Sequence, residues 1–120
     1  MNDALIDDVD DAVERIISEG TDHFSRHIWD ESSLLERLIL SAAAEELTQK
    51  QLDHTGVDAI FDKLKPLLPD FSRKHSMETL ERLVSKEILA ETNMRYCFPV
   101  NLLRKWIAAR YPLRKVREEI

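Results

Sequence analysis

Hydrophobic positions recur at helical spacing along most of the chain. In the stretch 3–19, Leu5, Val9 and Ile16 belong to one apolar stripe, and most of the acidic residues lie off it. Residues 34–47 contain too many apolar residues for one face of a helix. We therefore expect a central helix that other helices contact on several sides. The helices predicted in this way are 3–19, a short helix from Thr21 through Trp29, 34–47, 57–65, 76–86 and 101–111.

Residues that favour the start or the end of a helix lie at the boundaries of these predicted helices. Ser33 and Glu36 have the spacing of a capping box, in which each side chain accepts a hydrogen bond from the other residue's backbone amide. Gly20 suits the left-handed conformation with which helices often end. Pro66 and Pro112 lack an amide donor, so the helices before them are expected to stop there.

The period of the pattern changes between residues 88 and 98. Residues 88–91 and 95–98 read as strands, and the turn between them contains Asn93, which tolerates a positive φ. We therefore expect a β-hairpin here. The polar stretch 48–56 is expected to form a loop or a short strand.

This order of elements predicts a mainly α fold of the winged helix-turn-helix type. The three helices that precede the hairpin would form the core, and the hairpin would be the wing. Residues 1–31 are expected to be acidic N-terminal helices that act as a linker or a packing extension. Residues 32–113 would be the winged-helix domain with an extra C-terminal helix, and the tail 114–120 is expected to fray.

Composition excludes several classes of protein. The chain has 120 residues, 43% hydrophobic and 33% charged, which suits one packed domain rather than a disordered acidic tail. No apolar run reaches the roughly 20 residues of a membrane span, and no signal peptide is expected. Cys97 is the only cysteine, so a cytoplasmic location is expected. The only glycines are Gly20 and Gly56, which excludes a glycine-rich phosphate loop within this sequence.

Charge is distributed unevenly along the chain. Residues 1–31 carry ten acidic residues against Arg15 and Arg26, whereas residues 72–117 carry eleven basic residues against four glutamates. Such an asymmetry suggests an anionic partner for the second half. The alternative is that the two ends pack against or near each other, because charges act mostly within a Debye length of about 10 Å.

The residue types that carry catalysis or bind metals do not form a site in this sequence. His23 and His27 are four apart and could share a metal, and Asp22 and Asp30 are near enough to add oxygen ligands, but no second His pair or Cys cluster completes the set. Cys97 has no histidine nearby in sequence to activate it, and helix capping accounts for Ser32 and Ser33. We therefore expect no enzyme activity, no metal and no cofactor.

Several segments resemble the C-terminal winged-helix region of bacterial and archaeal P-loop ATPases of the AAA/STAND type, over roughly residues 21–114. The most specific part is an aromatic strand that runs into a helix and a Pro-Leu end. The resemblance implies that the chain is a fragment or a stand-alone relative of such an ATPase, whose nucleotide site has no counterpart here. The segments that carry it are Phe24-x-x-x-Ile28-Trp29-Asp30, Ser33-x-x-Glu36-Arg37, Leu80-Glu81-Arg82-Leu83-Val84, Tyr96-x-Phe98-Pro99-Val100, Lys105-Trp106-Ile107 and Tyr111-Pro112-Leu113.

Two functions fit this prediction. We favour a non-catalytic module that makes protein–protein or regulatory contacts, with its own ATPase region, another subunit or a second copy as partner. The alternative is a DNA-binding winged helix that uses the 73–86 helix and the wing. Glutamates Glu78, Glu81 and Glu87 interrupt that surface and would repel phosphate. The candidate contact residues for either partner are Arg73, Lys74, His75, Arg82, Lys86 and Arg95.

Overall fold

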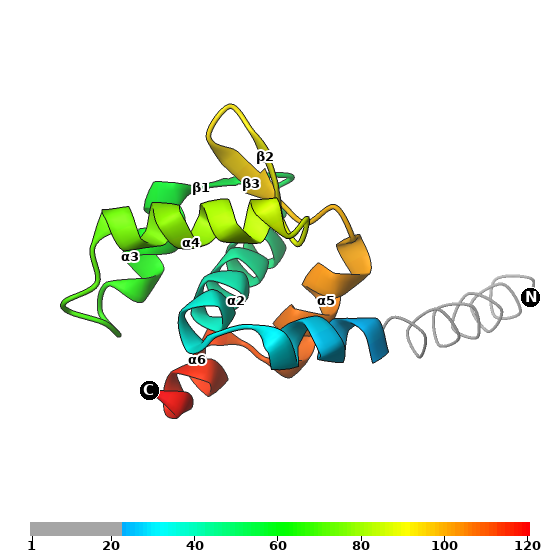
Figure 1. Ribbon diagram of the computed structural model, residues 1–120, viewed down its shortest axis with the longest axis horizontal. Coiled ribbons are helices and arrows are strands. Elements are labelled where there is room, and N and C mark those ends of the chain that lie inside the picture. The colour runs from blue at the N-terminus through cyan, green and yellow to red at the C-terminus, as the bar shows by residue number, and fades with distance from the viewer. Residues whose placement is uncertain (1–22) are drawn as a thin grey trace, which may run out of the picture. The chain divides into compact units, whose positions relative to one another are not determined.

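The structure is a computed structural model that describes residues 23–120 (Figure 1). The chain divides into two compact units, with the boundary between Glu31 and Ser32. In the first unit residues 23–31 are helical, as expected of the short helix after Thr21. The helix predicted over 3–19 lies outside the described residues. Within residues 23–120, no helix combines the length and the apolar character that crossing a membrane requires.

The second unit is mainly helical with a small antiparallel sheet, so the predicted mainly α class is confirmed. Each helix predicted between residues 34 and 111 is present, with bounds that differ by a few residues. The elements are α2 (Leu34–Gln49), β1 (Thr55–Gly56), α3 (Val57–Leu64), α4 (Arg73–Ser85), β2 (Ala90–Thr92), β3 (Arg95–Cys97), α5 (Asn101–Arg110), α6 (Leu113–Val116) and the 3-10 helix η1 (Arg117–Glu119).

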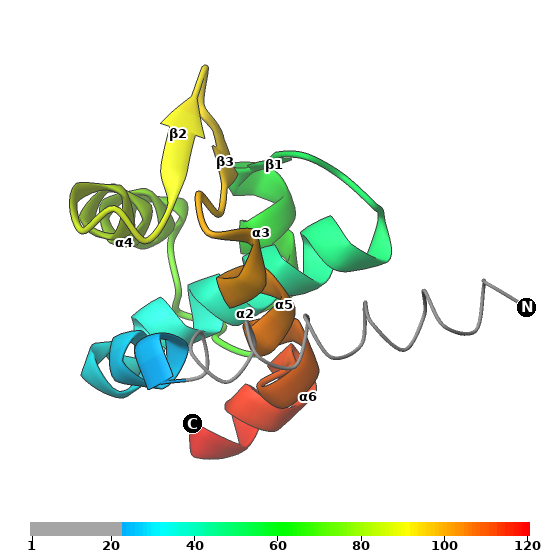
Figure 2. The ribbon, with the colours of Figure 1, turned by 90° about the vertical axis from the view of Figure 1, so that its right-hand side faces the viewer.

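Helix α2 is the centre of this unit. It contacts α3, α4, α5 and α6, and both views show it surrounded by them (Figures 1 and 2). Burial of each Leu or Ile side chain stabilises the fold by about 1.5–3 kcal/mol. The prediction of a central helix with more than one buried face is confirmed. The buried apolar residues of α2 are Leu38, Ile39, Leu40, Ala42, Ala43, Ala44 and Leu47.

The capping box at the start of α2 is also confirmed. The Oγ atom of Ser33 accepts a hydrogen bond from the Glu36 amide at 3.2 Å, and Oε1 of Glu36 accepts one from the Ser33 amide at 3.0 Å. These bonds satisfy backbone donors that have no partner within the helix. They fix the point at which the chain enters its core helix.

The predicted hairpin is present, and a third strand extends it. The sheet order is β1-β3-β2, and Tyr96 of β3 lies opposite Thr55 on one side and Glu91 on the other. The hairpin projects beyond the helices (Figure 2). Its turn residues Asn93 and Met94 have φ angles of 53° and 65°. Two consecutive left-handed residues give a turn whose twist matches that of the paired strands.

Helix α4 begins three residues earlier than predicted, at Arg73 instead of Ser76. The reason is a helix cap at Ser72. The Oγ atom of Ser72 accepts a hydrogen bond from the His75 amide at 3.2 Å. Consequently Arg73 and His75 belong to the first turn of the helix rather than to the segment before it.

The tail 114–120 does not fray as expected. After Pro112 the chain forms α6 and η1, and α6 contacts α2. Leu113 and Val116, three residues apart, share one face of the short helix, and Val116 is completely buried. Their burial gives α6 the tertiary contacts that a four-residue helix needs to form.

Candidate functional site

The six predicted contact residues come from two neighbouring elements. Four of them lie within α4, Lys86 ends that helix, and Arg95 begins β3 (Figure 1). All six side chains are exposed. The residues are Arg73, Lys74, His75, Arg82, Lys86 and Arg95.

These residues do not share one face of α4. Arg73 and Arg82 are nine positions apart, and because an α-helix turns by about 100° per residue they lie about 180° apart around the axis. Buried Leu80 and Leu83 define the inner side of the helix. The middle of its exposed side is therefore occupied by Lys74, Glu78, Glu81 and Ser85.

Two of the six residues form ion pairs with carboxylates. Nε of Arg73 lies 2.8 Å from Oδ1 of Asp58 in α3, and both side chains are more than half exposed. Nζ of Lys86 lies 2.9 Å from Oε2 of Glu36, whose side chain is only 6% exposed. The carboxylate of this second pair is buried while Lys86 stays half exposed, and the contact ties α4 to α2. It leaves Lys86 less available to a partner.

The pKa of Glu36 is lowered by its surroundings. Burial alone raises it, because a low-dielectric environment disfavours the charged carboxylate. Hydrogen bonds with Ser33 and Lys86, together with the positive charge of Lys86, outweigh that effect. Glu36 is therefore held as a carboxylate by the contacts that connect the two helices.

Local contacts orient two more of the predicted residues. The imidazole of His75 stacks on Phe71, with ring centroids 6.3 Å apart, and its Nδ1 lies 3.0 Å from the Ser72 hydroxyl. Nη2 of Arg82 donates a hydrogen bond to Oγ1 of Thr79 at 3.1 Å. Both side chains are thereby held along their own helix.

Arg95 and Lys74 complete the set. Nη2 of Arg95 donates a hydrogen bond to the carbonyl oxygen of His54 at 3.2 Å, which connects β3 to the segment before β1. Within residues 23–120, Lys74 makes no ion pair with a carboxylate. Among the predicted basic contact residues, Lys74 is therefore the one most available to a partner in the described structure.

Both α4 and the hairpin also carry acidic residues. The pKa of Tyr96 is raised because burial disfavours the phenolate and because the charges of Glu91 and Glu81 repel it. Glu91 is on β2 and Glu81 is on the exposed side of α4. The predicted contact surface is therefore one of mixed charge, with acidic groups at its middle.

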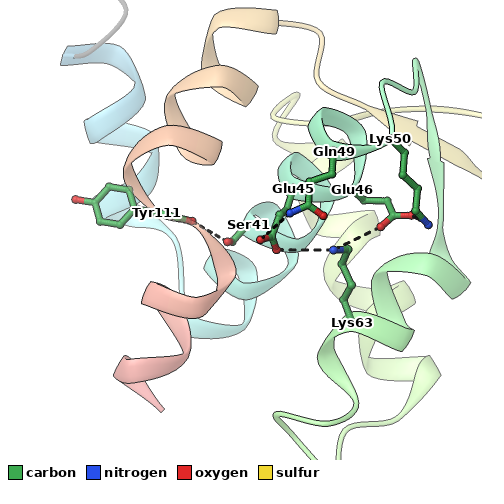
Figure 3. Close-up of polar contacts among 7 residues, drawn as sticks. All are labelled: Ser41, Glu45, Glu46, Gln49, Lys50, Lys63 and Tyr111. Atoms are coloured by element: carbon green, nitrogen blue, oxygen red, sulfur yellow. Dashed lines mark hydrogen bonds and ion pairs between the residues drawn. The ribbon is translucent and has the colours of Figure 1, made fainter.

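A second polar cluster, which the sequence analysis missed, connects α2 to its neighbours (Figure 3). The Glu46 side chain is only 5% exposed, and its carboxylate lies 2.6 Å from Nζ of Lys50 and 3.6 Å from Nζ of Lys63 in α3. On the same helix, the hydroxyl of Ser41 donates a hydrogen bond to the Tyr111 carbonyl oxygen at 2.7 Å. The sequence feature that could have indicated this cluster is the position of Glu46 within an apolar stretch. These contacts stabilise the packing of α2.

Two hollows open on the α5 side of the unit. The larger, about 530 Å³, lies among the end of α2, Cys97 and the start of α5 and includes Arg104 and Lys105. Arg104 bonds to Oγ1 of Thr48 at 2.7 Å and to Oδ1 of Asn101 at 2.9 Å. Cys97 is part of its lining, and no histidine lines this hollow.

The smaller hollow, about 430 Å³, lies at the other end of α5. Four of its lining residues are basic and one is acidic. Its lining consists of Ala109, Arg110, Pro112, Arg114, Lys115, Arg117 and Glu118.

The histidines considered as metal ligands do not form a metal site in the described chain. Nε2 of His27 lies 3.7 Å from Oε1 of Glu31, and both side chains are largely exposed. Over residues 23–120, no group of three or more His, Cys, Asp or Glu side chains is arranged to hold a metal ion. A comparison with family models, curated proteins and solved structures finds no match to this chain.

Proposed function

We propose that residues 32–120 are a non-catalytic winged-helix module of an ATPase-type protein that makes protein–protein or regulatory contacts. Helices α2, α3 and α4 correspond to its three-helix core, and β2 and β3 to its wing. The short strand β1 lies between α2 and α3 in the chain and pairs with β3. This pairing supports the assignment. The partner is the protein's own ATPase region, another subunit or a second copy of the chain.

The observation that carries the proposal is the charge on the exposed side of α4. Glu78 and Glu81 lie between the basic residues on its two flanks. A helix that enters the major groove approaches phosphates on both sides, and carboxylates there are repelled. A surface of mixed charge suits a protein partner, where complementary charges fix orientation and suppress wrong partners.

The alternative is a DNA-binding winged helix that uses α4 and the hairpin. The exposed side chains of Lys74 and Arg95 favour it, because both can reach phosphates. The pairs Arg73–Asp58 and Lys86–Glu36 weaken it, because each cation already has a carboxylate partner. We therefore favour the protein contact.

Sedimentation velocity of the full chain over a wide concentration range tests the proposal for a second copy. We expect reversible association that Glu81→Arg weakens, whereas Glu118→Arg, the same change on an exposed residue of η1, leaves it unchanged. A monomer at every concentration contradicts contact with a second copy. Tight, sequence-specific binding of duplex DNA at physiological salt, lost in a Lys74→Glu variant, contradicts the protein-contact proposal as a whole.

A further inference from the structure

The strongest concentration of positive charge in the described chain is on α5 and α6 rather than on α4. Residues 101–117 contain six basic residues and no acidic residue. By contrast, the stretch 73–86 contains Glu78 and Glu81 beside its basic residues. The six are Arg104, Lys105, Arg110, Arg114, Lys115 and Arg117.

The basic residues of α5 border the two hollows, Arg104 and Lys105 the larger one and Arg110 the smaller one. Lys105 borders the larger hollow, and Ala109, one helical turn further along the same side, borders the smaller one. The ten residues of α5 extend over about 15 Å. Lys105 and Arg110 lie about 140° apart around the axis, because an α-helix turns by about 100° per residue, so the cations are spread along and around α5 and do not converge on one point. Helices α4 and α6 lie apart in both views (Figures 1 and 2).

Aromatic rings hold two of the cations in place. The guanidinium of Arg110 lies over the ring of Trp106, 5.8 Å from its centroid, and Nζ of Lys115 lies over Tyr111 at 5.3 Å. Such contacts restrict long side chains before any ligand arrives, which lowers the entropy lost on binding. Arg114 and Arg117 are exposed and form no ion pair with any carboxylate of residues 23–120.

The surface offers charge but few apolar contacts. Trp106, Leu113 and Val116 are buried, and none of the large exposed apolar side chains of the described chain lines the smaller hollow. A protein partner draws most of its binding energy from apolar and aromatic anchors, whereas a nucleic-acid backbone requires mainly cations. The arrangement therefore favours phosphates over an acidic protein segment.

We propose that the α5–α6 surface binds the phosphate backbone of nucleic acid without reading its sequence. Arg110, Arg114, Lys115 and Arg117 contact phosphates at the smaller hollow, and Lys105 extends the contact along α5. Glu118, at the edge of the hollow, limits the affinity. The net charge of −6 makes binding strong only at low salt, where displacement of counterions from the backbone contributes most. This site is separate from α4, so it does not depend on the function proposed above.

Fluorescence anisotropy with a labelled duplex of mixed sequence tests this site in the full chain. The double variant Arg114→Gln/Arg117→Gln removes two cations, and Arg73→Gln/Lys74→Gln removes two from α4 as the matched control. We expect the first variant to weaken binding about tenfold at low salt and to reduce the log–log salt slope by about 2. The control variant should change the affinity by less than about twofold.

Further measurements separate charge from folding and from other anions. Arg114→Lys/Arg117→Lys keeps the charge and should restore most of the binding, and thermal unfolding shows that each variant is folded. Absence of duplex binding at low salt overturns the proposal, as does a loss confined to the α4 variant. A poly-glutamate peptide that binds as tightly as the duplex, and is equally sensitive to Arg114→Gln/Arg117→Gln, also overturns it in favour of an acidic protein segment.

Discussion

Glu36 in the first turn of α2 accepts a hydrogen bond at 2.9 Å from Nζ of Lys86, the residue that ends α4. The same carboxylate closes the capping box with Ser33. One buried acid therefore both starts the central helix and attaches the end of α4 to it. An unpaired carboxylate in this place would be costly, because little water reaches it.

Glu36→Gln should lower the free energy of unfolding at neutral pH by about 1–2 kcal/mol. Glutamine can still accept the hydrogen bond from the Ser33 amide, so the variant removes mainly the charge that Lys86 compensates. Urea unfolding measures the loss. Glu78→Gln, on the exposed side of α4, should have almost no effect, and an equal loss in both variants would contradict the role of the pair.

The difference between the wild type and Glu36→Gln should depend on pH. Because the pKa of Glu36 is lowered from 4.5 in the folded protein, its contribution is complete above that value. It is lost as the pH falls through the folded-state pKa, where the carboxylate takes up a proton. Unfolding curves recorded at decreasing pH should therefore converge in acid. A difference that stays constant into acid would show that charge is not the cause.

Met94→Gly should stabilise the fold by about 0.5–1 kcal/mol. Met94 has a φ of 65° and its side chain is 50% exposed, so the substitution relieves the left-handed conformation and removes little packing. Met94→Ala keeps the Cβ atom and should bring no gain. Chemical denaturation of the two variants and the wild type checks this, and equal stability of the two variants would contradict the backbone explanation.

The core of the second unit could be predicted from the sequence because its signals are local. The apolar period marked α2, the Ser33–Glu36 pair marked its start, and the alternation around Asn93 marked the hairpin. Strand β1 consists of only two residues, too few to show a period, and α6 is similarly short. Both owe their structure to partners far away in the chain, β3 and α2 respectively.

The candidate site was less predictable because it depends on tertiary contacts. Nothing local indicates that Lys86 meets Glu36, fifty residues earlier in the chain, or that Arg73 meets Asp58. The opposite placement of Arg73 and Arg82 was available from helical geometry alone. Basic residues that are close together in the chain are separated by angle around the helix.

Tyr96 should ionise above pH 10.0, its ordinary value, in the folded protein. Burial disfavours the phenolate, and Glu91 and Glu81 add repulsion, so Glu91→Gln should lower the midpoint part of the way. Because the pKa of Tyr96 is raised in the folded state, the contribution of its neutral phenol to stability is fully present below pH 10.0 and decreases above it. Phenolate absorbance measures the titration, and Tyr96→Phe assigns it. A midpoint for Tyr96 at or below its ordinary value would contradict the buried position.

Val116→Ala should lower the free energy of unfolding by about 1–3 kcal/mol, because Val116 is completely buried. This result also tests whether the C-terminal segment is packed, because truncation of Val116 in a frayed tail would not change the free energy of unfolding. Arg117→Ala, one residue further along and exposed, is the matched control and should change stability only slightly. Urea unfolding monitored by tryptophan fluorescence gives both values. If the two variants were equally stable, α6 would not be packed on α2, and the basic hollow beside it would have no fixed shape.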